Sequence, residues 1–391
     1  MWKNLASNVL TLIIVGLVAA AAAAGWAQRE WVGEGPLETA MCLQVPQGGN
    51  MAGVARDLEE AGAVSSGSLF RVGSNYSGRQ GDLKAGSFLI EPGQSMEQIL
   101  ASVTGDGRST CGTRVAYIIG VNGQEVRVRE LDPDTQEFAI TAEFDPKVTT
   151  DMPEAFETAR QDVATEYLVT IVEGATSWQI VEGLKAFTLL DGEVPEVPGE
   201  GTLAPGSYEI RPGANRQAFL AELERLQAAQ LARAWEARAE DAPVNSPEEA
   251  LILASIIEKE TGIAEERPLV ASVFANRLAQ GIRLQTDPTV IYGVTGGQGV
   301  LGRGLRQSEL RAETPYNTYV IDGLPPGPIA NPGEAAIRAA LDPAETDYIF
   351  FVANCEGGHE FAVTLDEHNR NVAEWRRCEA ERAAAAEETA Q

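Results

Sequence analysis

The chain has 391 residues, of which 57 are acidic and 30 basic, so its formal net charge is −27. A nucleic-acid-binding protein of this size carries a basic patch that meets the phosphates; the sequence shows none, so we expect no nucleic-acid partner. Hydrophobic residues make up 44% of the chain, which excludes intrinsic disorder and is enough for two or three folded domains.

The first segment is an uncharged run of 19 residues from Val9 to Ala27. A helix of that length just crosses a bilayer, so we predict a transmembrane helix over 9–27 after a cytoplasmic tip over 1–8. The alternative is a cleaved signal peptide, because the alanine-rich end resembles a cleavage site. The length of the run, with Trp2 and Trp26 in the position of an aromatic belt, favours the anchor. The positive charge of Lys3 keeps the N-terminus in the cytoplasm and places the rest of the chain outside.

The four cysteines can pair in three ways. We favour the pairing in which each disulfide closes one compact segment, Cys42 with Cys111 and Cys355 with Cys378. The alternative is that all four thiols are unpaired. Disulfides fit an oxidising compartment outside the cytoplasm.

An internal repeat organises the first half of the chain. Val45–Gly62 is echoed by Ile171–Phe187, and Leu83–Leu100 matches Leu203–Leu220 at a constant offset of 120. Each copy begins with a strand-type residue, a glycine turn and an amphipathic helix, and ends with a strand, a Pro-Gly turn and another helix. This pattern predicts two small α+β modules and, taken alone, indicates a binding or scaffold unit rather than an active site.

The two modules are predicted over 40–112 and 166–245, and the second ends in a long helix over 218–239. Between them, 113–165 is predicted to be a strand-rich insertion, with hairpin turns at Asn122-Gly123 and at 132–135.

The last part of the chain is predicted to be an α+β domain over 246–378, followed by a flexible tail over 379–391. Its first helix has a clear start: Ser246 can cap it, Pro247 is its first residue, and Glu249 can close a capping box. Further elements are expected as a second helix over 265–278, a helix over 333–341, a buried strand over 348–353 and a final helix.

Glu258 lies near the end of that first, almost wholly apolar helix. Helical spacing places it on one face with Leu251, Ala254 and Ser255, whereas Glu260 points elsewhere. A carboxyl held against apolar neighbours is favoured in its neutral form, as a general acid requires. The alternative is a solvated charge at a helix end.

Polar and aromatic side chains gather in two later stretches. Amides and hydroxyls can hydrogen-bond the hydroxyl and acetamido groups of a sugar polymer, and aromatic rings can stack on its faces. The alternative is that these residues are ordered loops that cap a core. The candidate substrate-binding residues are Gln285, Asp287, Tyr292, Tyr316, Asn317, Tyr319 and Asn331.

Four motifs in register resemble the endolytic murein transglycosylase (YceG-like) family over roughly 246–371. They read ASIIEKETG, VASVFANRLAQGIRLQTDPTVIYG, TPYNTYVIDGLPPGPIANPG and FFVANCEGGHEFAVTLDEHN. The resemblance implies a single-pass inner-membrane anchor, a lysin-motif-like module and a periplasmic catalytic domain, with Glu258 as the catalytic residue. It also implies cleavage within nascent peptidoglycan strands, which would terminate their elongation, and synthases as possible partners. The chain departs from the family in a glycine-rich loop over 295–304 and in the extended insertion.

The implied reaction is a lytic transglycosylation at the bond between N-acetylmuramic acid and N-acetylglucosamine, with a 1,6-anhydro end as product. It needs one carboxyl and no cofactor. The two histidines, His359 and His368, lack a third ligand, so we expect no metal. Two alternatives stay open: a muramidase-type hydrolase that uses Glu258 and Asp287, and a non-catalytic peptidoglycan-binding scaffold.

Overall fold

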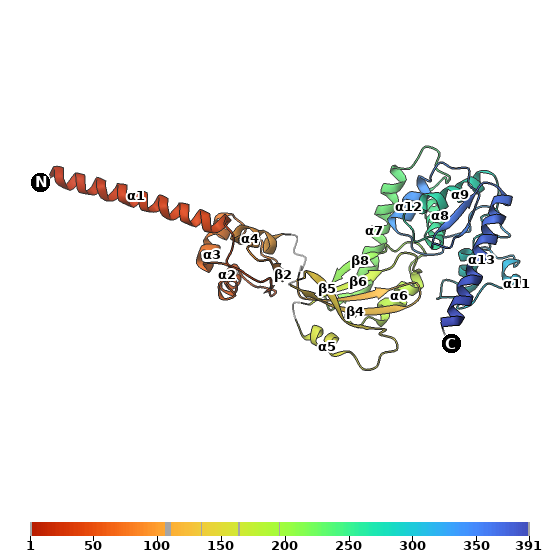
Figure 1. Ribbon diagram of the computed structural model, residues 1–391, viewed down its shortest axis with the longest axis horizontal. Coiled ribbons are helices and arrows are strands. Elements are labelled where there is room, and N and C mark those ends of the chain that lie inside the picture. The colour runs from red at the N-terminus through yellow and green to blue at the C-terminus, as the bar shows by residue number, and fades with distance from the viewer. Residues whose placement is uncertain (1, 106–110, 134, 163–164, 195, 390–391) are drawn as a thin grey trace. The chain divides into compact units, whose positions relative to one another are not determined.

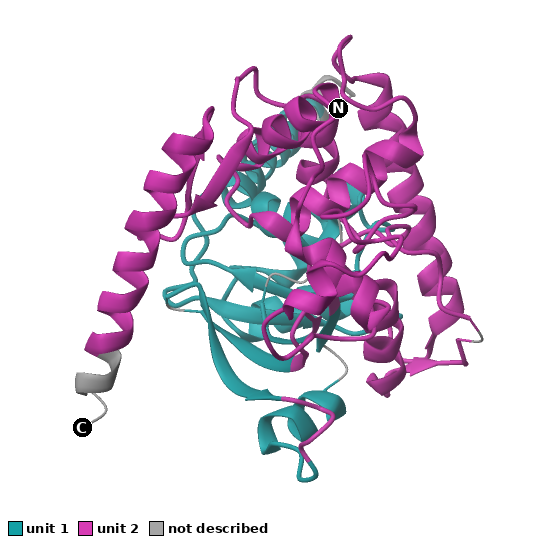
Figure 2. Ribbon diagram, turned by 90° about the vertical axis from the view of Figure 1, so that its right-hand side faces the viewer, with its two compact units in different colours: residues 1–116, 126–144, 150–168 teal, residues 117–125, 145–149, 169–391 magenta. Residues whose placement is uncertain are grey.

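The computed structural model describes residues 2–105, 111–133, 135–162, 165–194 and 196–389. The fold is mixed α+β, as predicted. The chain divides into two compact units: one comprises 1–116, 126–144 and 150–168, and the other 117–125, 145–149 and 169–391 (Figure 2). Each unit is described by itself below.

The first unit begins with helix α1, Trp2–Val32 (Figure 1). Its stretch Leu10–Val32 is long and apolar enough to cross a membrane, and none of it is buried, although a signal sequence would have the same character. The helix is longer than the predicted span, because its last turns pack on the protein: the Trp31 and Phe70 ring centres are 6.0 Å apart. The side chains of Trp2 and Lys3, on which the predicted aromatic belt and orientation partly depend, lie outside the described part of the structure.

The first repeat copy folds as strand, two helices, strand and helix. The two strands pair antiparallel, from Met41↔Ile90 to Val45↔Gly86. Side-chain caps start all three helices, and the helix after the second strand has a full capping box of Ser95 and Gln98. A disulfide joins Cys42 to Cys111, one of the pairs that the sequence favoured. The elements are β1 Met41–Val45, α2 Met51–Glu60, α3 Gly67–Tyr76, β2 Gly86–Ile90 and α4 Met96–Thr104.

A five-stranded sheet follows, in the strand order β5-β4-β3-β6-β8. The predicted meander supplies β3, β4 and β5, and the second repeat copy supplies β6 and β8. The insertion and the second copy therefore share one sheet. The predicted hairpin turn is present, with the Gly120 amide donating to the Gly123 carbonyl. Part of the second predicted turn, residue 134, lies outside the described residues. The elements are β3 Thr113–Ile119, β4 Gln124–Asp132, β5 Glu137–Phe144, α5 Glu154–Gln161, β6 Glu166–Ile171 and β8 Gly206–Ile210.

The second repeat copy has the strand–helix–strand–helix order predicted for it. Thr176 and Gln179 form a capping box at the start of its first helix. Where the first copy has α3, this copy has a loop with the short strand Leu190–Asp191, which pairs in parallel with a second short strand, Ala214–Asn215, that follows β8. The remaining elements are α6 Ser177–Ala186, β7 Leu190–Asp191, β9 Ala214–Asn215 and α7 Arg216–Glu236.

The last part of the chain has a helical core, in which buried apolar residues of several helices form one cluster that includes Leu253, Ile257, Phe274 and Ile337. The elements are α8 Pro247–Glu260, α9 Arg267–Ala279, α10 Asp287–Thr295, α11 Gln307–Leu310, α12 Glu334–Leu341, β10 Phe350–Ala353, β11 His359–Ala362 and α13 Leu365–Thr389.

Three expectations for this part need correction. Ser246 caps α8, but the Glu249 carboxylate accepts from the Asn245 amide, 2.7 Å, so the capping box is not closed. Strand β10 is half-buried rather than buried, because it pairs only with β11 in a two-stranded sheet. Strand β11 itself and helix α10 were not predicted.

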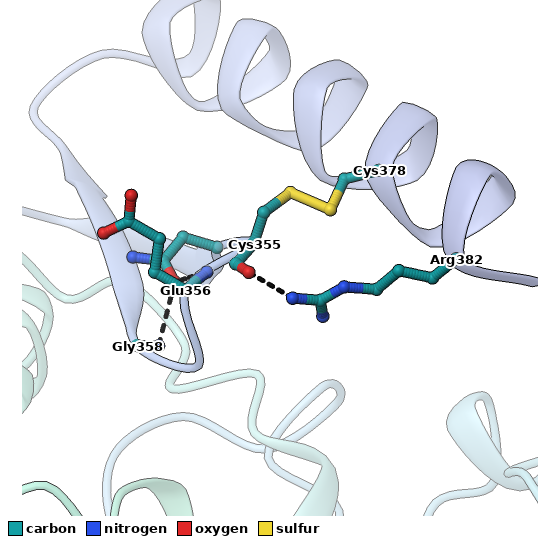
Figure 3. The surroundings of a disulfide bond; sticks show 6 residues. Cys355, Glu356, Gly358, Cys378 and Arg382 are labelled. Carbon is teal, nitrogen blue, oxygen red and sulfur yellow. Dashed lines mark hydrogen bonds between the residues drawn. A yellow bond between two sulfur atoms is a disulfide. The ribbon is translucent and has the colours of Figure 1, made fainter. Parts of the chain in front are cut away.

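A second disulfide links the last helix to the loop after β10. It joins Cys355, in that loop, to Cys378 on α13 (Figure 3). Arg382, one turn further along α13, donates to the Cys355 carbonyl. The helix continues to Thr389, through most of the segment predicted as a tail.

Candidate active site

The site is built on the face of α8 that carries Ser255 and Glu258. The Ser255 hydroxyl accepts from the Ile329 amide, 3.0 Å, and the Glu258 Oε2 accepts from the Gly333 amide, 2.9 Å. The two side chains are three residues apart and therefore on neighbouring turns of one helix face. Together they hold the segment 329–333 along this face, and Glu258 remains half-buried there.

The electrostatic surroundings favour the neutral form of Glu258. Burial is the largest effect and raises the pKa of its carboxyl above the usual range. The Gly333 hydrogen bond lowers this pKa and the charge of Glu173 raises it, while Arg267 and Lys259 lower it. The net direction is upward, as a proton donor at neutral pH requires.

Lys259, the next residue, interacts electrostatically with two carboxyl groups. Its ammonium donates to the Gly174 carbonyl, 3.3 Å, and burial lowers its pKa, while the charges of Glu258 and Glu200 act in the opposite direction. Sequence reasoning passed over this residue, although it stands inside the EKET motif.

Glu200 is a second half-buried carboxyl that sequence reasoning missed. It accepts from the Ser177 amide, 2.8 Å, and from the Tyr292 hydroxyl, 3.2 Å. Burial raises its pKa, and these hydrogen bonds lower it only in part. It lies in a loop of the second repeat copy, where no motif marks it.

Two of the predicted substrate-binding residues are fully buried. The Asn331 amide group donates to the Ala175 carbonyl, 2.9 Å, and its oxygen accepts from the Leu203 amide, 2.8 Å. The Asn317 amide group donates to three carbonyls, including Ala312 at 2.7 Å. Both residues are 0% exposed. Their side chains hold loops together, so we do not carry them into the proposed glycan contacts.

The charge of Asp287 acts on Glu260, and Asp287 is not among the groups that shift the pKa of Glu258. It accepts from the Tyr319 hydroxyl, 2.7 Å, and its charge raises the pKa of Glu260, for which burial is the larger cause. Glu260 itself accepts from the Thr286 hydroxyl. Gln285, two residues before Asp287, is exposed. Its backbone is left-handed, with φ 50°, which is uncommon for a residue other than glycine.

A cavity of about 340 Å³ is lined by the residue that follows Glu258 and by the glycine-rich loop. The ring of Tyr292, another wall residue, packs against that of Tyr316, with ring centres 4.9 Å apart and the planes tilted by 53°. The lining also includes Thr176, Ile329 and 299–303. A larger cavity of about 830 Å³ is lined by α9, by Glu249 and Ile252 of α8 and by loop segments, and among the described residues Glu258 is part of the wall of neither cavity. The smaller cavity adjoins the end of α8, beside Lys259 and the Tyr292–Tyr316 pair.

His359 has a structural partner that the sequence did not reveal. Its Nδ1 lies 2.7 Å from Glu266 Oε2, and its amide donates to the same carboxylate, 2.8 Å. Burial raises the pKa of Glu266, but these contacts and the Thr261 hydroxyl outweigh it and lower the pKa overall. No group of three potential metal ligands occurs among the described residues.

Comparisons with known proteins place the chain in a family. A sequence model of the YceG-like family matches residues 141–374. A relative from Bacillus subtilis, named endolytic murein transglycosylase, is 27% identical over 85% of this chain and 84% of its own length. A relative of the same name from Streptococcus pneumoniae is 28% identical over 84% of this chain and 57% of its own length.

The similar solved structures include a yceG-like protein from Listeria monocytogenes. It is 24% identical, covers 85% of this chain and 99% of its own, and superposes with a TM-score of 0.45. Because the family model matches more than half of the sequence, including the whole of α8 and the segment that holds Glu258, the chain belongs to the YceG-like family.

Proposed function

We propose that the chain is an endolytic peptidoglycan lytic transglycosylase with Glu258 as its general acid and base. The observation that carries the proposal is the half-buried Glu258 carboxyl, whose pKa is raised by burial and whose position is fixed by the Gly333 amide. Membership of the YceG-like family and the name of the two relatives agree with this activity.

The reaction needs one carboxyl that works twice. Protonated Glu258 donates its proton to the glycosidic oxygen between N-acetylmuramic acid and N-acetylglucosamine as the bond from that oxygen to the muramyl C1 breaks. The resulting carboxylate accepts the proton of the muramyl C6 hydroxyl as that oxygen bonds to C1. The products are a free N-acetylglucosamine 4-hydroxyl and a 1,6-anhydro end. Glu258 is again protonated, and no water is consumed.

The surroundings of Glu258 suit both halves of this cycle. Burial stabilises the neutral acid before cleavage, and the nearby cations Lys259 and Arg267 favour the carboxylate that forms during cleavage. The neighbouring Tyr292 and Tyr316 rings offer apolar area beside the site for sugar faces.

The hydrolase alternative assigns a second, base role to Asp287. The hydrogen bond of Asp287 to Tyr319 and its electrostatic influence on Glu260 give it surroundings separate from those of Glu258. We therefore favour the transglycosylase over the muramidase-type hydrolase.

The proposal extends to the location of the enzyme. An apolar α1 and two disulfides fit a protein held by one helix in the bacterial inner membrane with its other domains on the periplasmic side. There it would cut nascent strands and so end their elongation, next to peptidoglycan synthases. The two repeat copies would be lysin-motif-like modules that hold the strand.

The experiment compares the detergent-solubilised full chain with its Glu258→Gln variant on purified uncrosslinked glycan strands. The variant keeps the shape of the side chain and loses the proton, so we expect folding and strand binding to be retained and cleavage to fall by about 10²- to 10⁴-fold. New chain ends are counted by mass spectrometry. An active variant would overturn the assignment of Glu258, and a wild-type chain that binds strands without producing ends would identify the non-catalytic scaffold instead.

A further inference from the structure

The glycine turn of the second repeat copy has the same backbone design as the turn of the first. Val45–Met51 aligns with Ile171–Ser177, so that Gly48 corresponds to Gly174. Both glycines are left-handed, with φ 75° and 79°. In each turn the residue two positions further on caps the following helix with its side chain. The two turns therefore differ in what surrounds them rather than in their conformation.

The surroundings of the second turn are the candidate acid and its neighbour. A methyl group placed on Gly174 would lie 3.7 Å from Cγ of Glu258 and 3.5 Å from Cδ of Lys259, whereas one on Gly48 would meet nothing within 4 Å. The Gly174 carbonyl accepts from Lys259, and its amide donates to the Asn331 carbonyl, 2.9 Å. The turn is thus packed against the end of α8.

Glu173, the residue before this glycine, brings a carboxyl to the same place. Its carboxyl group occupies the space where a side chain on Gly333 would begin. The amide of that same Gly333 donates to Glu258, 2.9 Å. Two carboxyl groups from segments 85 residues apart therefore contact one glycine, and Glu173 is exposed and reachable from solvent. The corresponding residue of the first copy is Gln47, which carries no charge.

We propose that Glu173 is a positioning residue of the active site, whose negative charge beside Glu258 keeps the catalytic carboxyl protonated for proton donation. This inference rests on the function proposed above. It assigns the second repeat copy a part in the chemistry, which the repeat alone did not indicate.

The expected pH dependence follows from the charges that face Glu258. Glu173 comes from the turn after β6, Lys259 from α8 itself and Arg267 from α9. A negative neighbour disfavours the Glu258 carboxylate, and the two cations favour it. Cleavage is lost as the pH rises through the pKa of Glu258, because the proton donor disappears. Removal of the Glu173 charge lowers that pKa, so the basic limb of the pH–rate profile moves to lower pH.

The test measures kcat/KM of the full chain on uncrosslinked glycan strands across the pH range in which the protein stays folded. For Glu173→Gln we expect unchanged activity on the acidic side and roughly a three- to tenfold loss at pH values above the limb. Glu173→Asp keeps the charge and should keep the limb near its wild-type position. Glu173→Lys reverses the charge and should move the limb further in the same direction as Gln, so that the charge series remains readable if one variant folds poorly.

Two controls change charge elsewhere. Gln47→Glu places a carboxylate in the turn of the first copy, and Glu209→Gln removes an exposed one from β8; whatever they do to strand binding, both should leave the pH position of the basic limb unchanged. A wild-type profile for Glu173→Gln, or an equal loss at every pH, would overturn the inference. Glu258→Gln, run in parallel, separates the two proposals: if it is inactive while Glu173→Gln is normal, the proposed function stands and the role of Glu173 falls.

Discussion

The two repeat copies share an element order and differ in their neighbours. In the first copy, Gly48 faces open space, and the copy is closed by the disulfide from Cys42 to Cys111. In the second copy, Gly174 packs on Glu258, and Glu200 reaches Tyr292 near the cavity. One small α+β design therefore forms a separate module in the first copy and a wall of the candidate active site in the second. Function therefore follows from the surroundings of each copy and not from its fold.

The largest effect on stability and cleavage is expected at Asn331, whose side chain joins the 329–333 segment to two loops of the second copy. Asn331→Ala leaves the buried Leu203 amide without its partner and removes one of the two hydrogen bonds that the Ala175 carbonyl accepts from Asn331. We expect a loss of about 1–3 kcal/mol in the free energy of unfolding, together with reduced cleavage, because the turn beside Glu258 loosens. Chemical denaturation and the strand-cleavage assay measure the two effects.

Asn317→Ala is the matched control, because its amide is equally buried but bonds within 309–319. It should cost similar stability. If it also lowered cleavage as much as Asn331→Ala, the effect would reflect general destabilisation and the special link to the second copy would be refuted.

A smaller effect separates the two turns directly. Gly48→Ala and Gly174→Ala both place a side chain on a left-handed residue, so each should cost about 1–2 kcal/mol of stability. Only the new methyl group on Gly174 touches the acid and its lysine, at ordinary contact distances. We expect the cleavage rate to change in Gly174→Ala alone, as measured by steady-state kinetics on glycan strands. Equal kinetics for both variants would contradict the claim that only the turn of the second copy affects the active site.

Local patterns in the sequence predicted much of the fold. The 3.6-residue period correctly placed Glu258 on one face with Ser255, and both side chains hold backbone amides of the same segment. The strand–turn–helix order of both copies followed from their glycine turns and the helical spacing of their apolar residues. Relationships of this kind are local, so a single sequence carries them.

Long-range relationships were not predictable in the same way. Glu173 and Glu200 lie far from Glu258 along the chain, and nothing in their own surroundings marks them as site residues. Asn317 and Asn331 were predicted as glycan contacts because amides can hydrogen-bond the hydroxyl and acetamido groups of sugars, yet both amides are buried and bond to the protein's own backbone. Burial depends on which segments pack over a loop, and the loop sequence alone does not contain that information.

The most direct test of the central claim is cleavage of glycan strands by the full chain in water enriched in ¹⁸O, with the new ends read by mass spectrometry. The account predicts 1,6-anhydro ends that carry no ¹⁸O, because the muramyl C6 hydroxyl and not water closes on C1. Reducing ends that contain one ¹⁸O atom would contradict it and identify a muramidase-type hydrolase.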